Sequence, residues 1–246
     1  MSAATHEQLP ALIARYESDS RSGAVRVVEQ ARRRLARDRE ESARLIRLAE
    51  AERRMMDAGV ALVAGVDEVG RGALAGPVSA GTCIFGRDVM IPGLDDSKRL
   101  SRASRERLSG EITAAALACS VGHAEPGEID AIGIAGATVL AMRRALDGLG
   151  VIPEHVLIDG RPVDVGCPST AIVRGDATVR AIAAAAILAK VARDALMVEL
   201  DGAHPGYGLA GNKGYGSADH LAALADIGPS PIHRRSFSPC SQSTLF

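Results

Sequence analysis

The sequence predicts an α/β protein in which a mixed β-sheet is flanked by helices and preceded by a helical N-terminal extension. From residue 60 onward, short apolar runs that are partly β-branched alternate with longer helical patterns. Strands come first and then alternate with helices, an order that suits a mixed sheet covered by helices. The residues before 60 are rich in Arg, Glu and Ala and show no strand-like run. We therefore expect an extension over 1–59, a main domain over 60–239 and a flexible tail over 240–246.

The N-terminal extension is predicted to form two helices. Residues 6–17 place Leu9 and Tyr16 on one face, and the run 17–23 then interrupts the pattern. A second helical pattern covers 24–57. We favour a solvated amphipathic helix that packs on the main domain, and the alternative is an arm that grips a nucleic-acid duplex.

The main domain begins with a short apolar run at 62–66, which is typical of a buried strand. The expected strands lie near 62–67, 77–86, 118–124, 154–159 and 169–174. The expected helices lie near 101–117, 136–148, 178–202 and 217–226. Residues 202–216 are rich in glycine and predict a loop.

Composition and charge narrow the class of protein. The chain is 47% hydrophobic and 24% charged, which is ordinary for a soluble globular protein. Because the formal net charge is −1, any nucleic-acid surface must be local. We find no secretory signal or membrane-spanning run, and the four cysteines are widely spaced, so we expect a cytoplasmic protein without a membrane partner. His204 and His220 are expected at the surface or in turn caps rather than as zinc ligands.

Four carboxylates stand at the ends of predicted elements. Asp67 and Glu68 end the first strand, just before a Gly-Arg-Gly turn. Asp159 ends another apolar run, and Asp176 precedes an Ala-rich helix. Structural interpretations exist for each: a solvated strand end, an Asp-Gly turn for Asp159 and a helix N-cap for Asp176. Converging carboxylates would instead need cations, and Mg²⁺ or Mn²⁺ prefers such oxygen ligands.

Asp67 and Glu68 are neighbours in the sequence, which limits how both could belong to one site. Neighbouring residues of a regular strand point to opposite faces of the sheet. Asp67 and Glu68 would therefore serve one site only if the backbone leaves the regular pleat at this point. The glycines at 70 and 72 are residues that permit such a departure.

Ordered motifs run through the whole main domain. They occupy 65–72, 75–78, 96–98, 100–101, 158–160, 175–176, 182–194, 212–216 and 228–237. Together these motifs, over about residues 60–239, resemble bacterial ribonuclease HII, and so many matches in order are far more specific than one short motif. The resemblance implies the ribonuclease H-like fold, whereas periodicity alone gives only the α/β class.

The resemblance also implies a metal-dependent endoribonuclease of ribonucleotide excision repair. Such an enzyme would hydrolyse the RNA strand of RNA–DNA hybrids and nick duplex DNA on the 5′ side of an embedded ribonucleotide, leaving 3′-hydroxyl and 5′-phosphate ends. The resemblance assigns two divalent cations, Mn²⁺ or Mg²⁺, to the site. Their implied ligands, which are also the implied catalytic residues, are Asp67, Glu68, Asp159 and Asp176.

Substrate binding is implied for a second set of residues. These are Gly70, Arg71, Gly72, Lys98, Lys213 and Tyr215. Glycine lets backbone groups approach the 2′-hydroxyl that distinguishes RNA from DNA. The Tyr215 ring would pack on the next sugar, although it has an alternative role as a cover for the sheet edge. The two lysines would bind phosphates.

Two positions depart from the family pattern, in that Ala181 and Ala186 stand where serine is usual. We interpret Ala186 as a packing change and expect Ala181 to remove a hydrogen bond to a phosphate. Two other functions stay open. A ribonuclease HIII-like enzyme would cut hybrids only, and Arg71 disfavours it because threonine stands there in that family. A catalytically decayed nucleic-acid-binding protein is disfavoured by the presence of all four acids.

The C-terminal tail carries a separate motif. Gln242, Leu245 and Phe246 resemble the short peptide with which bacterial repair proteins dock on the DNA sliding clamp. An exposed Leu-Phe pair is unfavourable in water, so a partner would explain it. The alternative is that these residues pack back on the main domain.

Overall fold

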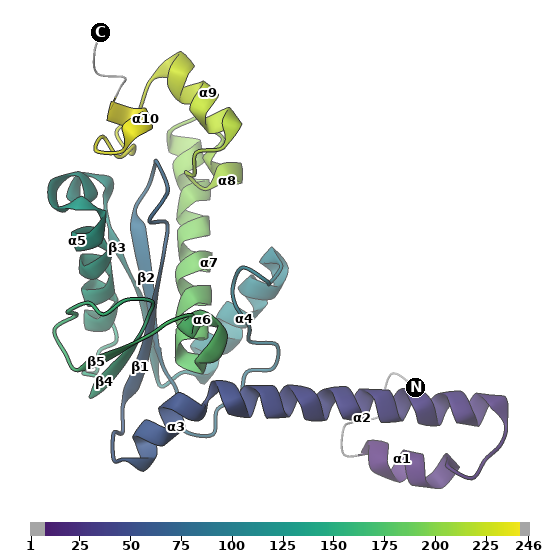
Figure 1. Ribbon diagram of the computed structural model, residues 1–246. Helices are drawn as coiled ribbons and strands as arrows, with labels where there is room; N and C mark the ends of the chain where they lie inside the picture. Colours follow the sequence, from purple (N-terminus) through teal and green to yellow (C-terminus); the bar gives the residue numbers. More distant parts are fainter. Residues whose placement is uncertain (1–7, 242–246) are drawn as a thin grey trace. The chain divides into compact units, whose positions relative to one another are not determined.

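The computed structural model describes residues 8–241, and its core is a five-stranded sheet of order β3-β2-β1-β4-β5 (Figure 1). The strands are β1 (Val63–Val69), β2 (Val78–Ile84), β3 (Ala118–Ala124), β4 (His155–Asp159) and β5 (Ser169–Ile172). β2 pairs antiparallel with β1 and β3, whereas β4 pairs parallel with β1 and β5. The expected mixed sheet is confirmed, with each predicted strand present.

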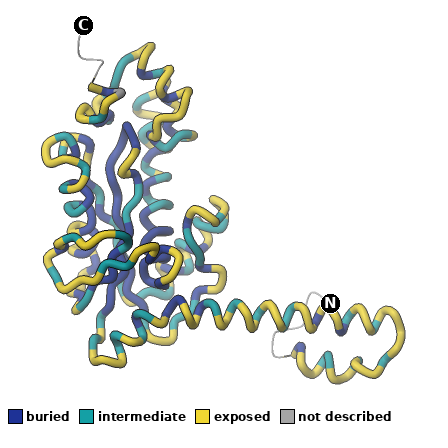
Figure 2. The backbone as a smooth tube through the Cα atoms, in the orientation of Figure 1, coloured by how far each residue is buried: buried dark blue, intermediate teal, exposed yellow. Residues whose placement is uncertain are grey.

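Two long helices, α5 (Pro126–Asp147) and α7 (Arg180–Ala203), cover opposite faces of this sheet (Figure 1). Alternate residues of β1 face one helix or the other. Ala64 belongs to the apolar core on the α5 side. Gly65 lies against α7 so closely that an added Cβ would be 2.2 Å from the carbonyl carbon of Ala181. Figure 2 shows the central strands buried between the helices, whereas the edge strand β5 is exposed or half-buried.

The other helices of the main unit are shorter. They are α3 (Glu50–Asp57), α4 (Arg102–Ala115), α6 (Gly175–Thr178), α8 (Leu209–Asn212), α9 (Ala218–Ile227) and α10 (Ser238–Ser241). Single-turn helices such as α6 and α8 are too short to show periodicity, and the sequence predicted neither. α5 begins at Pro126, well before the predicted residue 136. A kink at Gly133 (φ +73°) divides the helix, and the prediction covered only the part after this kink.

The residues before Leu48 form a compact unit of their own. This unit contains α1 (Leu9–Tyr16) and most of α2 (Ser22–Leu48). The predicted helix over 24–57 is therefore two helices, α2 and α3, that meet at Ala49. Among residues 8–241, no helix is long and apolar enough to cross a membrane.

A buried ion pair fixes the start of α7. Glu52 of α3 accepts hydrogen bonds from the Arg180 guanidinium and, at 2.7 Å, from the backbone N–H of Ala181. The side chains of Glu52 and Arg180 are each 1% exposed. Arg180 also donates to the carbonyl of Val89 and lies 5.0 Å from the ring centre of Phe85. Because α6 immediately precedes α7, this pair also anchors the segment that carries Asp176.

Replacing Glu52 with Ala is expected to lower the free energy of unfolding by about 3–5 kcal/mol, because it leaves a buried guanidinium without its anion. Glu50→Ala is the matched control on the same helix, since Glu50 pairs with Arg54 at the exposed surface. Its cost should stay below about 1 kcal/mol. Urea unfolding of the three proteins measures both values, and equal costs would contradict the assignment.

Candidate active site

Three of the four predicted carboxylates converge near the C-terminal ends of two neighbouring strands of the sheet. Asp67 lies in β1, Asp159 ends the parallel neighbour β4, and Asp176 lies in α6. One carboxylate oxygen from each lies within 4.8 Å of the others. Asp67 and Asp176 are buried, and Asp159 is partly exposed. This donor set, made only of carboxylate oxygens, fits a hard divalent cation.

The backbone around α6 brings Asp176 into this cluster. Arg174 adopts a left-handed conformation (φ +57°) that turns the chain from β5 into α6. The backbone N–H of Gly175 donates to Asp159 Oδ1 at 2.6 Å, and that of Asp176 lies 3.4 Å from the same oxygen. Asp159 thus caps α6 with its side chain, which fixes the orientation of its carboxylate.

The cluster is electrostatically strained in the absence of cations. Burial, and then repulsion from Glu68 and Asp159, holds the pKa of Asp67 well above its ordinary value. Burial and the neighbouring Asp176 also raise the pKa of Asp159. Lys98 relieves part of this charge, since its Nζ lies 2.7 Å from Asp176 Oδ2. Carboxylates that resist ionisation when metal-free are expected where a cation normally neutralises them.

Glu68 is not one of the three carboxylates that lie within 4.8 Å of one another, although it lines the same pocket as Asp67 and Asp159. β1 stays in regular register with β2 through Val69, so Asp67 and Glu68 point to opposite faces. The break in the pleat, which the sequence analysis made a condition for both acids to serve one site, is absent, yet both side chains line one pocket, so the condition was too strict. Glu68 Oε1 instead accepts a hydrogen bond from Arg71 Nη1 at 3.0 Å. Its position as a metal ligand stays a prediction.

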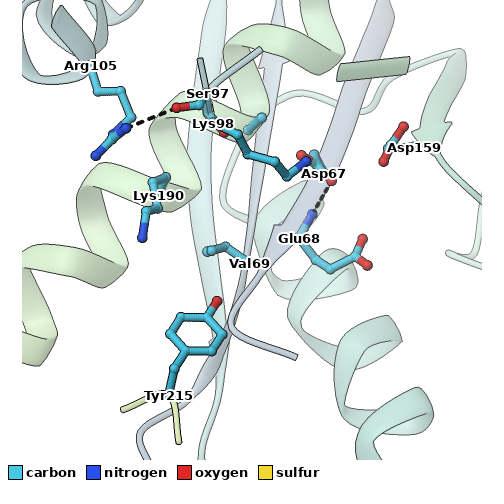
Figure 3. Close-up of a pocket in the computed structure, with 10 residues that line it drawn as sticks. Asp67, Glu68, Val69, Ser97, Lys98, Arg105, Asp159, Lys190 and Tyr215 are labelled. Atoms are coloured by element: carbon cyan, nitrogen blue, oxygen red, sulfur yellow. Dashed lines mark hydrogen bonds between the residues drawn. The ribbon is translucent and has the colours of Figure 1, made fainter. Parts of the chain in front are cut away.

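A pocket of about 440 Å³ opens over the carboxylates (Figure 3). It is lined by Asp67, Glu68, Val69, Ser97, Lys98, Arg105, Asp159, Ala186, Lys190 and Tyr215. A second groove of about 710 Å³ lies beside it and shares Glu68 and Asp159. Arg71 and Arg161 line this groove. The carboxylates thus stand between two openings that both carry basic side chains.

The two unusual alanines differ in how they meet the expectations. Ala181 is fully buried, and its backbone lies against Gly65 of the sheet, so a side chain here faces the core and not a phosphate, and the expected loss of a phosphate contact is wrong. Ala186 is 4% exposed, which agrees with the expected packing change, and it also lines the pocket. Of the two positions, only 186 would offer a serine hydroxyl to that pocket.

The predicted substrate-binding residues occupy different surroundings. Lys98 and Tyr215 line the main pocket, while Arg71 lines the adjoining groove. Gly70 is buried with φ +86°, and Gly72 is exposed. Lys213 is not among the pocket residues, and its Nζ donates to the carbonyl of Ala210.

Two buried arginines hold these segments; they lie in the motifs 182–194 and 228–237, to which the sequence analysis assigned no such role. Arg234 donates to the carbonyls of Gly70 (2.7 Å) and Arg71 (2.8 Å). Arg193 donates to the carbonyls of Pro77 and Lys213, both at 2.9 Å. Burial lowers the pKa of Arg234 to about 10, so it is still charged at neutral pH. The Gly-Arg-Gly turn and the Tyr215 loop are thus tied to fixed cations inside the domain.

Two histidines are also buried against one another. His220 and His233 are at most 1% exposed, and their Nε2 atoms lie 3.0 Å apart. The expected surface position of His220 is therefore wrong, whereas the expected turn cap is present, since its Nδ1 lies 2.9 Å from the turn carbonyl of Tyr215. Burial and the neighbouring His220 lower the pKa of His233 from 6.5 to about 4.

The contribution of His233 to stability is expected to fall as the pH drops from 6.5 towards 4. In this window the unfolded chain binds a proton at His233 that the folded chain does not, so protons favour unfolding. The contribution is fully present above pH 6.5 and is lost as the pH falls through about 4. His233→Gln should flatten this part of the curve, whereas His155→Gln, at a more exposed histidine, should not. Urea midpoints at pH 7 and pH 4.5 test this, and parallel losses in all three proteins would contradict it.

Comparisons with known proteins identify the family of this chain. The family model for ribonuclease HII matches residues 64–240, and that for the ribonuclease HII N-terminal domain matches 1–56. Ribonuclease HII of Anaeromyxobacter sp. (strain Fw109-5) is 47% identical over 235 residues, covering 95% of this chain and 75% of the relative. That of Nitrosococcus oceani is 53% identical over 179 residues, covering 72% and 89%.

Solved structures give the same result for the fold. Ribonuclease H2 from Pyrococcus horikoshii OT3 has a TM-score of 0.62 and 26% identity, covering 74% of this chain and 96% of that one. The predicted ribonuclease H-like fold is confirmed. The chain belongs to the ribonuclease HII family, whose members are metal-dependent endoribonucleases that cleave the RNA strand of RNA–DNA hybrids.

Proposed function

We propose that this chain also nicks duplex DNA on the 5′ side of an embedded ribonucleotide, with two divalent ions, Mg²⁺ or Mn²⁺, at the carboxylate cluster. The observation that supports this proposal most strongly is the cluster of Asp67, Asp159 and Asp176, in which one carboxylate oxygen of each lies within 4.8 Å of the others. This cluster lies beside the Gly-Arg-Gly turn. When bound, the ions would lower the pKa of the attacking water and stabilise the leaving 3′ oxygen. The products would carry 3′-hydroxyl and 5′-phosphate ends, as ribonucleotide excision repair in the cytoplasm requires.

The carboxylates would hold these ions in different ways. Asp67 is central and buried, so it is suited to contact both ions. Asp159 is oriented by the amides of α6, and Asp176 is paired with Lys98. Glu68 would complete the set from the opposite face of β1, where it also borders the second groove. Release of Lys98 from Asp176 would free its ammonium group for a phosphate of the substrate.

Selectivity for the ribonucleotide would come from the Gly-Arg-Gly turn and Tyr215. A Cβ added at Gly72 meets no atom within 4 Å, so the backbone there is open to a ligand. Arg71 is half exposed and able to reach a phosphate. Tyr215 would pack on the sugar that follows the ribonucleotide and disfavour a 2′-hydroxyl there. Lys98 and Lys213 would add contacts to phosphates.

Cleavage of three labelled duplexes tests this function. They are a DNA duplex with one ribonucleotide, a continuous RNA–DNA hybrid and an all-DNA duplex, each with Mg²⁺, Mn²⁺ or EDTA. We expect metal-dependent cleavage of the first two, with the first cut on the 5′ side of the ribonucleotide. Cleavage of the hybrid alone would favour the ribonuclease HIII-like alternative. Binding of all three without cleavage would favour a decayed enzyme.

We further propose that the tail docks on the DNA sliding clamp. Gln242, Leu245 and Phe246 lie outside the described residues, and the proposal rests on their sequence. The described part of the chain ends at Ser241, an exposed residue at the end of α10. Retention on immobilised clamp should be lost in a protein of residues 1–241, and equal retention of both proteins would exclude docking through the tail.

A further inference from the structure

A chain of hydrogen bonds through two buried histidines ends at the backbone of Tyr215. His220 Nδ1 lies 2.9 Å from the carbonyl oxygen of Tyr215. His220 Nε2 lies 3.0 Å from His233 Nε2, and the backbone N–H of Ser230 donates to His233 Nδ1 at 3.1 Å. The ring of Tyr207 packs on both imidazoles, with centroids 6.1 Å from His220 and 4.6 Å from His233. The two imidazole rings are therefore shielded from water.

The backbone groups at the two ends of this series of hydrogen bonds determine which ring nitrogens carry a proton. A carbonyl oxygen only accepts, so His220 Nδ1 must carry a proton and donate to Tyr215. A backbone amide only donates, so His233 Nδ1 must accept, and a neutral His233 then carries its proton on Nε2. That proton is donated to the bare Nε2 of His220. Both rings are thus neutral, which agrees with the lowered pKa of His233.

This arrangement fixes the main chain of Tyr215 while leaving its ring available. The same carbonyl also accepts from the backbone N–H of Ser217 at 2.8 Å. The ring lines the main pocket, is 37% exposed, and lies with its centre 5.5 Å from the Arg193 guanidinium. The ring direction is therefore set by buried groups on its inner side, before any substrate arrives.

We propose that His220 is a positioning residue for recognition of the ribonucleotide–DNA junction, with His233 fixing the tautomer in which His220 donates to Tyr215. The inference rests on the proposed function of Tyr215. His220 is fully buried and does not line the pocket, so its effect passes through Tyr215 and not through contact with substrate.

Two substitutions at position 220 separate the two ring nitrogens. The amide nitrogen of Asn occupies the place of Nδ1, whereas that of Gln lies near Nε2. His220→Asn should keep the bond to Tyr215, and His220→Gln should lose it. The readout is kcat/KM on the single-ribonucleotide duplex divided by kcat/KM on the continuous hybrid. We expect this ratio to fall about tenfold in His220→Gln, the effect of one ordinary hydrogen bond, and to stay near wild type in His220→Asn.

A merely structural role would lower the melting temperature and both activities together in the two variants. His233→Asn, which removes the proton donor to His220, should lower the ratio in the same direction as His220→Gln, so the inference does not depend on one variant folding. His204→Gln is the nearby control and should change nothing. Equal ratios in His220→Asn and His220→Gln would overturn the inference.

A fluorescence measurement distinguishes the failure of this inference from the failure of the proposed function. The chain contains no Trp, so Tyr215→Trp introduces a single fluorophore at the site. Its anisotropy should be lower when combined with His220→Gln than with His220→Asn, and equal values would overturn the positioning role. Tyr215→Ala tests the function: if it leaves the ratio of activities unchanged, junction recognition by Tyr215 fails even where the anisotropies differ.

Discussion

Replacing Asp67 with Asn is expected to abolish cleavage and, at the same time, to stabilise the metal-free protein. Asp67 is central in the carboxylate cluster, and its loss should lower kcat by on the order of 10³-fold or more, as the removal of other major electrostatic groups does. In EDTA the same change removes a carboxyl group whose ionisation is opposed by burial and then by the charges of Glu68 and Asp159. Function and stability should therefore change in opposite directions.

Three measurements check this prediction. They are single-turnover cleavage of a hybrid with Mn²⁺, affinity for the hybrid by fluorescence anisotropy, and the melting temperature with EDTA. The matched control is Asp226→Asn, at an exposed carboxylate of α9 that should change none of them. Cleavage above a tenth of wild type would exclude Asp67 as a metal ligand. A lower melting temperature in EDTA would show that repulsion does not dominate at this position.

The sequence was sufficient to predict where the carboxylates meet. Each predicted strand is present, and Asp67 near the end of β1 lies beside Asp159 at the end of β4 because these two strands are parallel neighbours. The sequence was not sufficient to predict which face Glu68 occupies. Glycines at 70 and 72 permit a break in the pleat, but the register of β1 with β2 continues past Glu68, and pairing with a neighbouring strand is a tertiary property.

The roles of the buried supporting residues could not be predicted from the sequence, for a related reason. Arg193 and Arg234 satisfy their guanidinium groups with backbone carbonyls from distant segments, so no partner acid stands at a recognisable spacing. His220 finds its partner on a different element, and Glu52 reaches across to Arg180. A polar side chain looks the same in sequence whether it faces water or a buried carbonyl, and burial of this kind is decided by the whole fold.

The two glycines of the Gly-Arg-Gly turn are expected to respond differently to alanine. At Gly70 an added Cβ would lie 2.2 Å from Arg193 Nε, and φ is +86°, so both overlap and backbone strain result. Gly70→Ala should therefore lower the free energy of unfolding by roughly 2–5 kcal/mol. Gly72 is exposed with no atom within 4 Å of its Cβ position, so Gly72→Ala should change stability by less than about 0.5 kcal/mol.

Gly72→Ala is the more informative of the two, because the free protein tolerates it. If the backbone at Gly72 approaches the ribonucleotide, a methyl group there should lower kcat/KM on the single-ribonucleotide duplex by about 10²-fold, since a displacement of 1 Å at a reacting substrate has an effect of that size. Urea unfolding and cleavage assays on both variants separate the two effects. Gly72→Ala that retains wild-type cleavage would place the sugar away from this turn, and selectivity would then have to come from Arg71 and Tyr215. A Gly70→Ala protein as stable as wild type would mean that Arg193 moves aside, and the turn would not be held as rigidly as its buried hydrogen bonds indicate.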